Sequence, residues 1–288
     1  MTNSIPEFEN ADCVLITGSN TSEAHPLIAT RIMRAMANGA KVIVIDPRTI
    51  QSSMLADLHL KQRPGTDVAW LNGMMHVIIE EGLYDHDFVK NRTEGFEELK
   101  AAVAGYTPAR VQELAGIPAG DLETAARLFA SAERSAILYA MGITQHTTGV
   151  DNVVSCANLA MLTGNVGKPG TGVNPLRGQN NVQGACDLGG LPNVYSGYQA
   201  VTIEAVQAKF KEAWGHASPT RVGLTVTEMV DAAHHGDLKA LFVHGENPMD
   251  SDPDLNHVRS PLERSLIHIS RCRRHYRGVE RRGRPNQT

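Results

Sequence analysis

The strongest constraint on the fold is a pair of short apolar runs joined by a segment with helical spacing, close to the N-terminus. Residues 13–17 (CVLIT) and 41–45 (KVIVI) have the length and apolar character of buried strands, and turn residues follow each run. Between them, residues 24–38 space apolar side chains as a helix does, and Gly39 follows where a helix C-terminus favours glycine. This order predicts a βαβ unit with two parallel strands and a right-handed crossover.

Further helical and strand patterns alternate along the rest of the chain. Helices are predicted over residues 67–81, 96–104, 107–115, 118–132, 150–163 and 226–235, and strands over 135–140 and 240–244. The fold class is therefore α/β. We predict a parallel-sheet αβα Rossmann-like domain over residues 1–179, part of a second αβα domain over 180–259, and an Arg-rich tail over 260–288.

Charge is distributed unevenly between the body of the chain and its tail. Residues 260–288 hold eight arginines and two glutamates, whereas the whole chain has 27 basic and 31 acidic residues. The body is therefore acidic, and nothing in it predicts nucleic-acid binding. Two interpretations of the tail remain open: a basic arm for nucleic acid or membrane, or disordered or artefactual sequence foreign to the rest. The abrupt change of composition near Arg259 favours the second.

Composition also bears on location and on metal sites. No apolar run reaches 18 residues, and no signal peptide precedes the first strand, so neither a membrane span nor secretion is predicted. The four cysteines (Cys13, Cys156, Cys186 and Cys272) lack C-x-x-C spacing, which argues against zinc or an iron–sulfur cluster within this chain. Scattered reduced thiols, mostly buried, favour a cytoplasmic protein.

Polar residues and glycines follow the predicted strands at four places. They are Gly18-Ser19-Asn20, Asp46-Pro47-Arg48, Met141-Gly142 and Gly245-Glu246-Asn247. Because ligands of open parallel sheets bind at the carboxyl ends of the strands, we expect these residues to surround one crevice. Asp46 stands where dinucleotide folds carry a ribose-binding carboxylate, although a turn or helix cap is an equal alternative. The G-x-G-x-x-G pattern is absent, so a nicotinamide site is disfavoured and another nucleotide is not.

The segment 174–187 (NPLRGQNNVQGACD) surrounds one guanidinium, that of Arg177, with amides and glycines. Arginine offers a rigid pair of donors that matches a carboxylate or phosphate, so this segment predicts an anion site. A flexible surface loop is the alternative. Cys186 lies in the segment without a neighbouring base, which favours a structural thiol over a nucleophile.

Two further histidine positions attract attention. His146 follows a predicted strand end, where a role in a binding loop is reasonable. His234 and His235 precede Gly236 at a predicted helix end, where imidazoles commonly complement the helix dipole in solvent.

Several motifs together resemble one family. Residues 142–149 (GITQHTTG), 162–172 (LTGNVGKPGTG) and 174–187 resemble the catalytic subunits of molybdenum or tungsten formate dehydrogenases. These enzymes belong to the bis-molybdopterin guanine dinucleotide superfamily that includes dimethyl-sulfoxide reductase. Residues 16–20, 45–48 and 63–70 match the same family, and the resemblance extends from Met1 to about Asp254. The run RGQNNVQG resembles formate dehydrogenase more than nitrate reductase.

The resemblance implies a role for individual residues. Arg177 would hold the carboxylate of formate beside the metal as a catalytic residue, and Gln179 would contact a pterin or support the site. One guanine dinucleotide would be held by Gly18, Asn20, Glu23, Asp46, Arg48, Gly65 and Asp67, with Met141, Gly142 and Gln145 lining the same cofactor. Gly245, Glu246 and Asn247 would approach the second pterin. The implied reaction oxidises formate to carbon dioxide and passes two electrons to an acceptor, with electron-transfer subunits as partners.

The resemblance also has gaps. The family's metal ligand is a cysteine or selenocysteine followed by histidine, and that segment and the iron–sulfur domain would precede Met1. No residue of this chain is therefore assigned as a metal ligand, and an iron–sulfur cluster is expected only in the upstream part. We expect the middle of a longer subunit, inactive in isolation. Another molybdopterin oxidoreductase, such as nitrate reductase, and an inactive nucleotide-binding remnant remain alternatives.

Overall fold

The computed structural model describes residues 1–179, 181–243, 246–252 and 254–264. The chain divides into two units, Met1–Val182 and Gln183–Thr288, and each is described by itself. Within the described residues, no helix combines the length and the apolar character needed to cross a membrane.

The first unit is built on a five-stranded parallel sheet with the order β3-β2-β1-β4-β5. The strands are β1 (Cys13–Thr17), β2 (Lys41–Ile45), β3 (Leu58–Leu60), β4 (Ser135–Tyr139) and β5 (Gly172–Pro175). Thr17 is in register with Ile45 on one side and with Tyr139 on the other, so three central strands end level. The predicted α/β fold and its parallel βαβ unit are confirmed.

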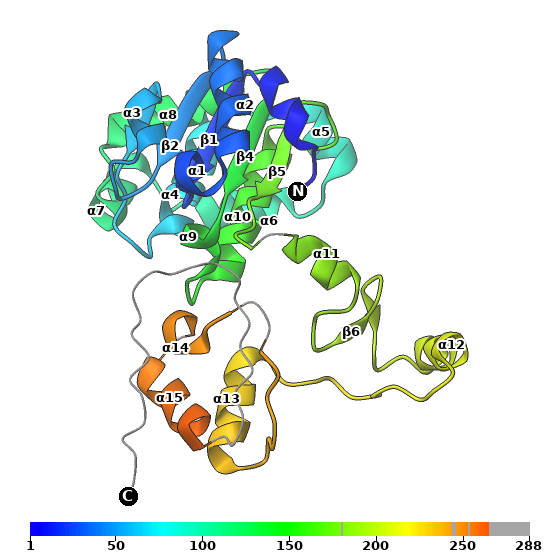
Figure 1. Ribbon diagram of the computed structural model, residues 1–288. Coiled ribbons are helices and arrows are strands. Elements are labelled where there is room, and N and C mark those ends of the chain that lie inside the picture. Colours follow the sequence, from blue (N-terminus) through cyan, green and yellow to red (C-terminus); the bar gives the residue numbers. More distant parts are fainter. Residues whose placement is uncertain (180, 244–245, 253, 265–288) are drawn as a thin grey trace, which may run out of the picture. The chain divides into compact units, whose positions relative to one another are not determined.

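Helices cover both faces of this sheet (Figure 1). One face packs against α4 (Asp67–Glu80), α8 (Ala119–Ser131) and α10 (Gly149–Leu162), with α5 (His86–Arg92), α6 (Phe96–Val103) and α7 (Pro108–Ala115) outside them. The other face packs against the 3₁₀ helix η1 (Ile5–Asn10), α2 (Pro26–Ala37) and the two residues that flank α3 (Gln51–Leu55), Ile50 and Ala56.

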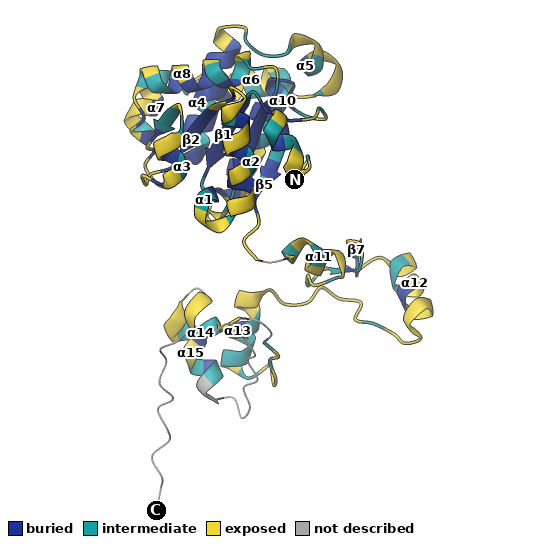
Figure 2. Cartoon of the chain, turned by 45° about the horizontal axis from the view of Figure 1, so that its top comes forward, coloured by how far each residue is buried: buried dark blue, intermediate teal, exposed yellow. Residues whose placement is uncertain are grey.

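Successive residues of the central strands supply the two apolar cores. Leu15 and Ile43 belong to the core on the α4 face, whereas Val14 and Val44 belong to the core on the α2 face. Because side chains alternate across a strand, a strand covered on both faces must be apolar throughout. This is why β1 is fully buried and why its sequence is apolar from Cys13 to Ile16 (Figure 2).

Two short helices follow β1 and β4 at the carboxyl edge of the sheet. They are α1 (Thr21–Ala24) and α9 (Met141–Thr144). The loops that carry them touch through glycine, because the Gly142 N–H donates to the Gly18 carbonyl oxygen at 3.0 Å. A Cβ atom on Gly142 would lie 2.6 Å from Gly18 Cα, and Gly18 itself has φ +57°. Only glycine permits this approach.

The helices predicted in the first unit are confirmed, with differences at their ends. The segment 24–38 is interrupted at His25, which ends α1 and precedes Pro26 at the start of α2. Asp67 begins α4 but does not cap it; Thr66 holds the cap position. The short strands β3 and β5 and the helices α3 and α5 were not predicted.

The second unit contains small elements. They are α11 (Val182–Asp187, which begins at the unit boundary), the antiparallel pair β6 (Val194–Tyr195) and β7 (Gln199–Ala200), α12 (Glu204–Trp214), α13 (Val226–His235), α14 (Pro248–Ser251) and α15 (Leu255–Arg264). Tyr195, Val201 and Phe210 form a small apolar cluster, in which the Tyr195 and Phe210 ring centroids lie 4.7 Å apart. The predicted helix 226–235 is confirmed as α13.

The strand predicted at 240–244 is wrong over its described part. Residues 240–243 form no strand beyond an isolated bridge position at Val243, and His244 lies outside the described residues. Phe242 is 78% exposed, so this apolar run is not covered as a core strand is. The second αβα domain remains a prediction. Of the tail, 260–264 belong to α15, and 265–288 lie outside the described residues.

Candidate functional site

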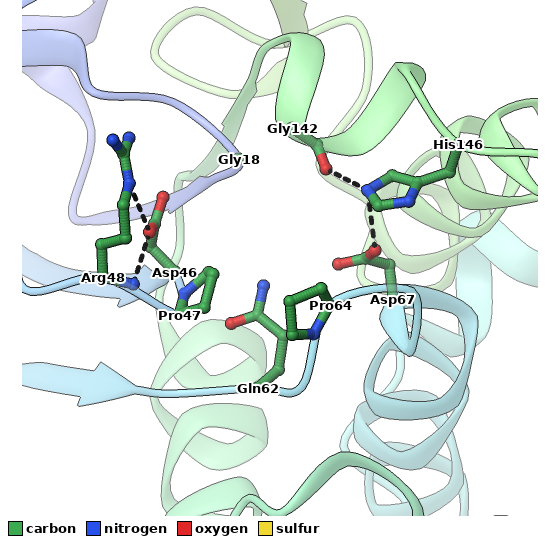
Figure 3. Close-up of a pocket in the computed structure, with 9 residues that line it drawn as sticks. All are labelled: Gly18, Asp46, Pro47, Arg48, Gln62, Pro64, Asp67, Gly142 and His146. Atoms are coloured by element: carbon green, nitrogen blue, oxygen red, sulfur yellow. Dashed lines mark hydrogen bonds and ion pairs between the residues drawn. The ribbon is translucent and has the colours of Figure 1, made fainter.

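A cavity of about 250 Å³ opens at the carboxyl edge of the sheet in the first unit. Residues that follow β1, β2, β3 and β4 line it together: Gly18, Asp46, Pro47, Arg48, Gln62, Pro64, Asp67, Gly142 and His146 (Figure 3). Parallel strands that end level bring these loops to one edge. Five of the residues predicted to bind a cofactor therefore meet in one pocket: Gly18, Asp46, Arg48, Asp67 and Gly142.

Asp46 is 4% exposed although it carries a carboxylate. The Arg48 backbone N–H donates to Asp46 Oδ1 at 2.8 Å, and the Arg48 guanidinium Nε lies 3.8 Å from the same oxygen. The carboxylate thus stabilises the turn after β2, as the alternative interpretation predicted, and it lines the cavity as well. The turn interpretation is thus confirmed, and the ribose-binding interpretation stays a prediction.

Asp67 is the second buried carboxylate of the pocket, at 2% exposed. Its Oδ1 accepts a hydrogen bond from Trp70 Nε1 at 3.2 Å, one turn further along α4. Its Oδ2 lies 3.8 Å from His146 Nε2, which also lies 2.9 Å from the Gly142 carbonyl oxygen. Because a carbonyl only accepts, His146 donates from Nε2, and the imidazole links the loop after α9 to the start of α4.

Four buried polar atoms near this edge have no hydrogen-bond partner within the described residues: Thr17 Oγ1, Asn20 Oδ1, His25 Nδ1 and Gln62 Oε1. A buried polar atom left unpaired costs on the order of 1–3 kcal/mol, so such atoms are commonly satisfied by a bound molecule. Their positions at or after the ends of β1 and β3 suit a polar ligand that carries hydrogen-bond donors.

Gln62 is the polar pocket residue that sequence analysis missed. It is 6% exposed and follows β3, a three-residue strand that was not predicted. Without that strand, nothing marked Gln62 as a strand-end residue. A signal did exist, since Gln62 immediately precedes the segment 63–70 that was matched to the family.

Arg177 lies at the same edge but does not line the cavity. It is exposed, two residues after the end of β5. The preceding Leu176 is buried, and its N–H donates to the Tyr139 carbonyl oxygen at 2.7 Å, which fixes the loop to the end of β4. His25 Nε2 lies 2.6 Å from the Arg177 carbonyl oxygen. Burial raises the pKa of the Tyr139 hydroxyl, and the positive charge of Arg177 opposes that shift.

The short helix α9 connects the cavity with the Arg177 loop. Gly142 lines the cavity, while a Cβ placed on Gly178 would lie 3.7 Å from Met141 Sδ. The other predicted residues of this unit do not line the cavity: Asn20 is half-buried at the start of α1, and Glu23, Gly65, Gln145 and Gln179 are exposed. Of the residues expected around one crevice, those that follow β1, β2 and β4 contribute to this pocket, and the exposed Arg177 loop approaches Met141 beside it.

Several other predicted positions lie in the second unit. Gly245 is outside the described residues. Glu246 accepts a hydrogen bond from Ser251 Oγ at 2.8 Å, and Asn247 precedes α14 as its cap residue. His234 and His235 end α13 before Gly236, as the helix-end interpretation predicted. Cys186 is buried in α11, and Cys13 and Cys156 are buried in the first unit, where burial raises the pKa of both thiols to about 12.

Comparison with known proteins assigns the family. The family model described as molybdopterin oxidoreductase matches residues 1–275, past Asp254, where the resemblance was expected to end. The chain belongs to the molybdopterin oxidoreductase family.

Several relatives of this molybdopterin oxidoreductase chain are formate dehydrogenases by name. The F420-dependent formate dehydrogenase 1 subunit alpha of Methanococcus maripaludis is 55% identical over 263 residues, which cover 91% of this chain and 39% of the relative. Formate dehydrogenase H of Escherichia coli is 48% identical over 264 residues, which cover 91% of this chain and 37% of that protein. The chain thus spans well under half the length of these relatives.

A solved structure supports the fold. Acetylene hydratase from Pelobacter acetylenicus superposes with a TM-score of 0.69 at 24% identity, covering 91% of this chain and 39% of that one. The likeness shows that the α/β arrangement is the one found in that enzyme.

Membership of the molybdopterin oxidoreductase family implies a molybdopterin cofactor with molybdenum or tungsten. The residues of the pocket fit such a group, because two glycines leave room, two carboxylates can accept hydrogen bonds, and Gln62 Oε1 has no donor among the described residues. Asn20 Oδ1, which does not line the cavity, also has no donor among them. Among the described residues, no group of three or more His, Cys, Asp or Glu side chains is arranged to hold a metal ion.

Proposed function

We propose that this chain forms the nucleotide-binding and formate-binding part of a formate dehydrogenase catalytic subunit. The observation that carries the proposal is the 55% identity to a formate dehydrogenase subunit alpha over 91% of this chain. A match of that length includes both the pocket and the Arg177 loop. The reaction converts formate to carbon dioxide, one proton and two electrons.

The cofactor in this proposal is a bis-molybdopterin guanine dinucleotide that carries molybdenum or tungsten, and it supplies the redox centre that accepts the two electrons. The cavity holds one guanosine end. Asp46 and Asp67 are buried acceptors suited to the N–H and hydroxyl donors of guanine and ribose, and Gln62 and Asn20 each present an oxygen that has no donor among the described residues. Gly18, Glu23, Arg48, Gly65, Met141, Gly142 and Gln145 complete this proposed nucleotide site.

Arg177 is the proposed formate-binding residue. Its guanidinium forms two parallel hydrogen bonds to a carboxylate and orients it, which lowers the entropic part of the barrier. An exposed position beside α9 suits a residue that must meet a diffusing anion at the rim of a cofactor site. Gln179 supports the same loop, and Glu246 and Asn247, with Gly245, are proposed to contact the second pterin.

The wider assembly is also a proposal. The relatives named subunit alpha indicate further subunits, and we infer that these carry electrons away from the site. An iron–sulfur cluster is proposed for the part of such proteins that lies upstream of the matched region. We further propose a cytoplasmic location.

The experiment is formate-dependent reduction of an artificial acceptor by the enzyme purified with its cofactor and accompanying subunits. Arg177→Ala should raise the KM for formate about 10- to 150-fold, the equivalent of a charge-assisted hydrogen bond of about 1.5–3 kcal/mol. Arg110→Ala is the matched control, because Arg110 is exposed on α7 and pairs only with its own helix and cap among the described contacts. It should leave KM unchanged.

Two outcomes would contradict the proposal. Turnover of nitrate without turnover of formate would make the chain part of another molybdopterin oxidoreductase. Purified protein without pterin and without molybdenum or tungsten would make it a nucleotide-binding remnant.

A further inference from the structure

We propose that His25 is a positioning residue that holds the backbone of Arg177, and thereby sets where the formate-binding guanidinium stands. The inference rests on the role of Arg177 in the proposed function. It is carried by one contact between segments 152 residues apart in the chain, in which His25 Nε2 lies 2.6 Å from the Arg177 carbonyl oxygen.

His25 is held rigidly by its own backbone. It lies between α1 and α2, and its N–H donates to the Thr21 carbonyl oxygen at 2.9 Å. Its carbonyl oxygen accepts the N–H groups of Ile28 and Ala29, each at 3.0 Å. The residue thus closes one helix and opens the next, and its imidazole projects from a fixed support.

The contact determines the tautomer of the ring. The Arg177 carbonyl oxygen only accepts, so His25 carries a proton on Nε2 and donates it. His25 Nδ1 is buried and has no partner within the described residues. The imidazole therefore acts toward the Arg177 loop as a one-point hydrogen-bond donor.

Two contacts fix the loop around Arg177, one made by the preceding Leu176 and one by His25. Leu176 is 3% exposed, belongs to the apolar core on the α2 face, and donates its N–H to the Tyr139 carbonyl oxygen. Immediately after Arg177, Gly178 gives the backbone its widest conformational freedom. The hydrogen bond from His25 fixes the peptide group that joins Arg177 to Gly178. The side chain of Arg177 therefore starts from a defined point and direction.

The first test reads the loop directly and needs neither cofactor nor turnover. Trypsin cleaves after arginine, so the rate of cleavage at the Arg177–Gly178 bond, followed by mass spectrometry on the full chain, reports how often this loop opens. His25→Ala should raise that rate about two- to tenfold, because a net hydrogen bond is worth about 0.5–1.5 kcal/mol and cleavage follows the open population.

Two variants separate positioning from general destabilisation. His25→Gln places an amide donor near the position of Nε2 and should restore slow cleavage. His25→Asn places its donor near the position of Nδ1, too far from the Arg177 carbonyl, and should behave as His25→Ala does. Cleavage at the wild-type rate in His25→Ala, or equal behaviour of the Gln and Asn variants, would overturn the inference.

The second test uses the formate-oxidising enzyme. His25→Ala should lower kcat/KM for formate about two- to tenfold, mainly through KM, with recovery in His25→Gln. In an Arg177→Ala background the same change should have no further effect, because two residues that act through one contact are not additive. Additive losses would overturn the inference. Absence of formate oxidation in the wild-type enzyme would instead refute the proposed function and leave the trypsin result standing.

Discussion

At the scale of single residues, the cavity at the carboxyl edge of the sheet depends on two glycines as much as on its carboxylates. The loops after β1 and β4 are joined by one backbone hydrogen bond, between the N–H of Gly142 and the carbonyl oxygen of Gly18. A side chain on either residue would meet backbone rather than flexible atoms. This contact holds together the loops after β1 and β4, which line the cavity through Gly18, Gly142 and His146.

Gly142→Ala should therefore destabilise the protein. The new Cβ would lie 2.6 Å from Gly18 Cα and 2.8 Å from the Gly18 carbonyl oxygen, so one loop must move. We expect a loss of about 1–3 kcal/mol in the free energy of unfolding, measured by urea denaturation. Gly120→Ala in α8 is the control, since its Cβ would enter open space; it should gain up to about 1 kcal/mol. Equal stability of the two variants would refute the close approach as a constraint.

At the scale of helices and strands, sequence patterns predicted the long elements of the first unit and missed its short ones. In the second unit they predicted α13 and missed α12 and α15. β1, β2 and β4 were predicted because strands covered on both faces need unbroken apolar runs. β3 has three residues and β5 contains Gly172 and Pro175, so neither shows such a run. The run at 240–243 shows the converse: it is apolar, yet its described residues form no strand beyond the bridge position at Val243, and Phe242 is 78% exposed.

The contribution of Glu7 in the 3₁₀ helix η1 to the stability of the protein can be tested by changing the pH. Hydrogen bonds from the Asn3 amide, and then from the Ser4 side chain and backbone, lower the pKa of Glu7 to about 2. The unfolded value is about 4.3. Because the folded pKa is the lower one, this contribution to stability is complete above about pH 5 and is lost as the pH falls toward 2. The difference in unfolding free energy between wild type and Glu7→Gln should shrink through that interval.

A variant of the principal donor serves as the companion measurement. Asn3→Ala removes the largest cause of the shift, so the pKa of Glu7, followed by NMR of its side-chain carboxyl carbon, should rise toward its ordinary value. A difference between wild type and Glu7→Gln that does not change with pH would contradict this account of the helix start.

At the scale of the whole molecule, one topological rule assembled most of the candidate site from sequence. Strands that run parallel end at one edge, and this sufficed to place Gly18, Asp46 and Gly142 together. The rule did not predict Gln62 as a site residue, because Gln62 follows β3, which was not predicted. It also did not predict the contact of His25 with the Arg177 loop, which joins segments 152 residues apart. Such contacts arise from the packed chain and leave no local pattern.

The central claim is that the cavity at the carboxyl edge holds the guanosine end of a pterin cofactor. The most direct measurement is an experimental structure of the protein purified with its cofactor. We expect guanine or ribose atoms within hydrogen-bond distance of Asp46 or Asp67, with Gln62 Oε1 and Asn20 Oδ1 accepting donors from the nucleotide. A nucleotide bound elsewhere, with both carboxylates facing only protein or solvent, would contradict it.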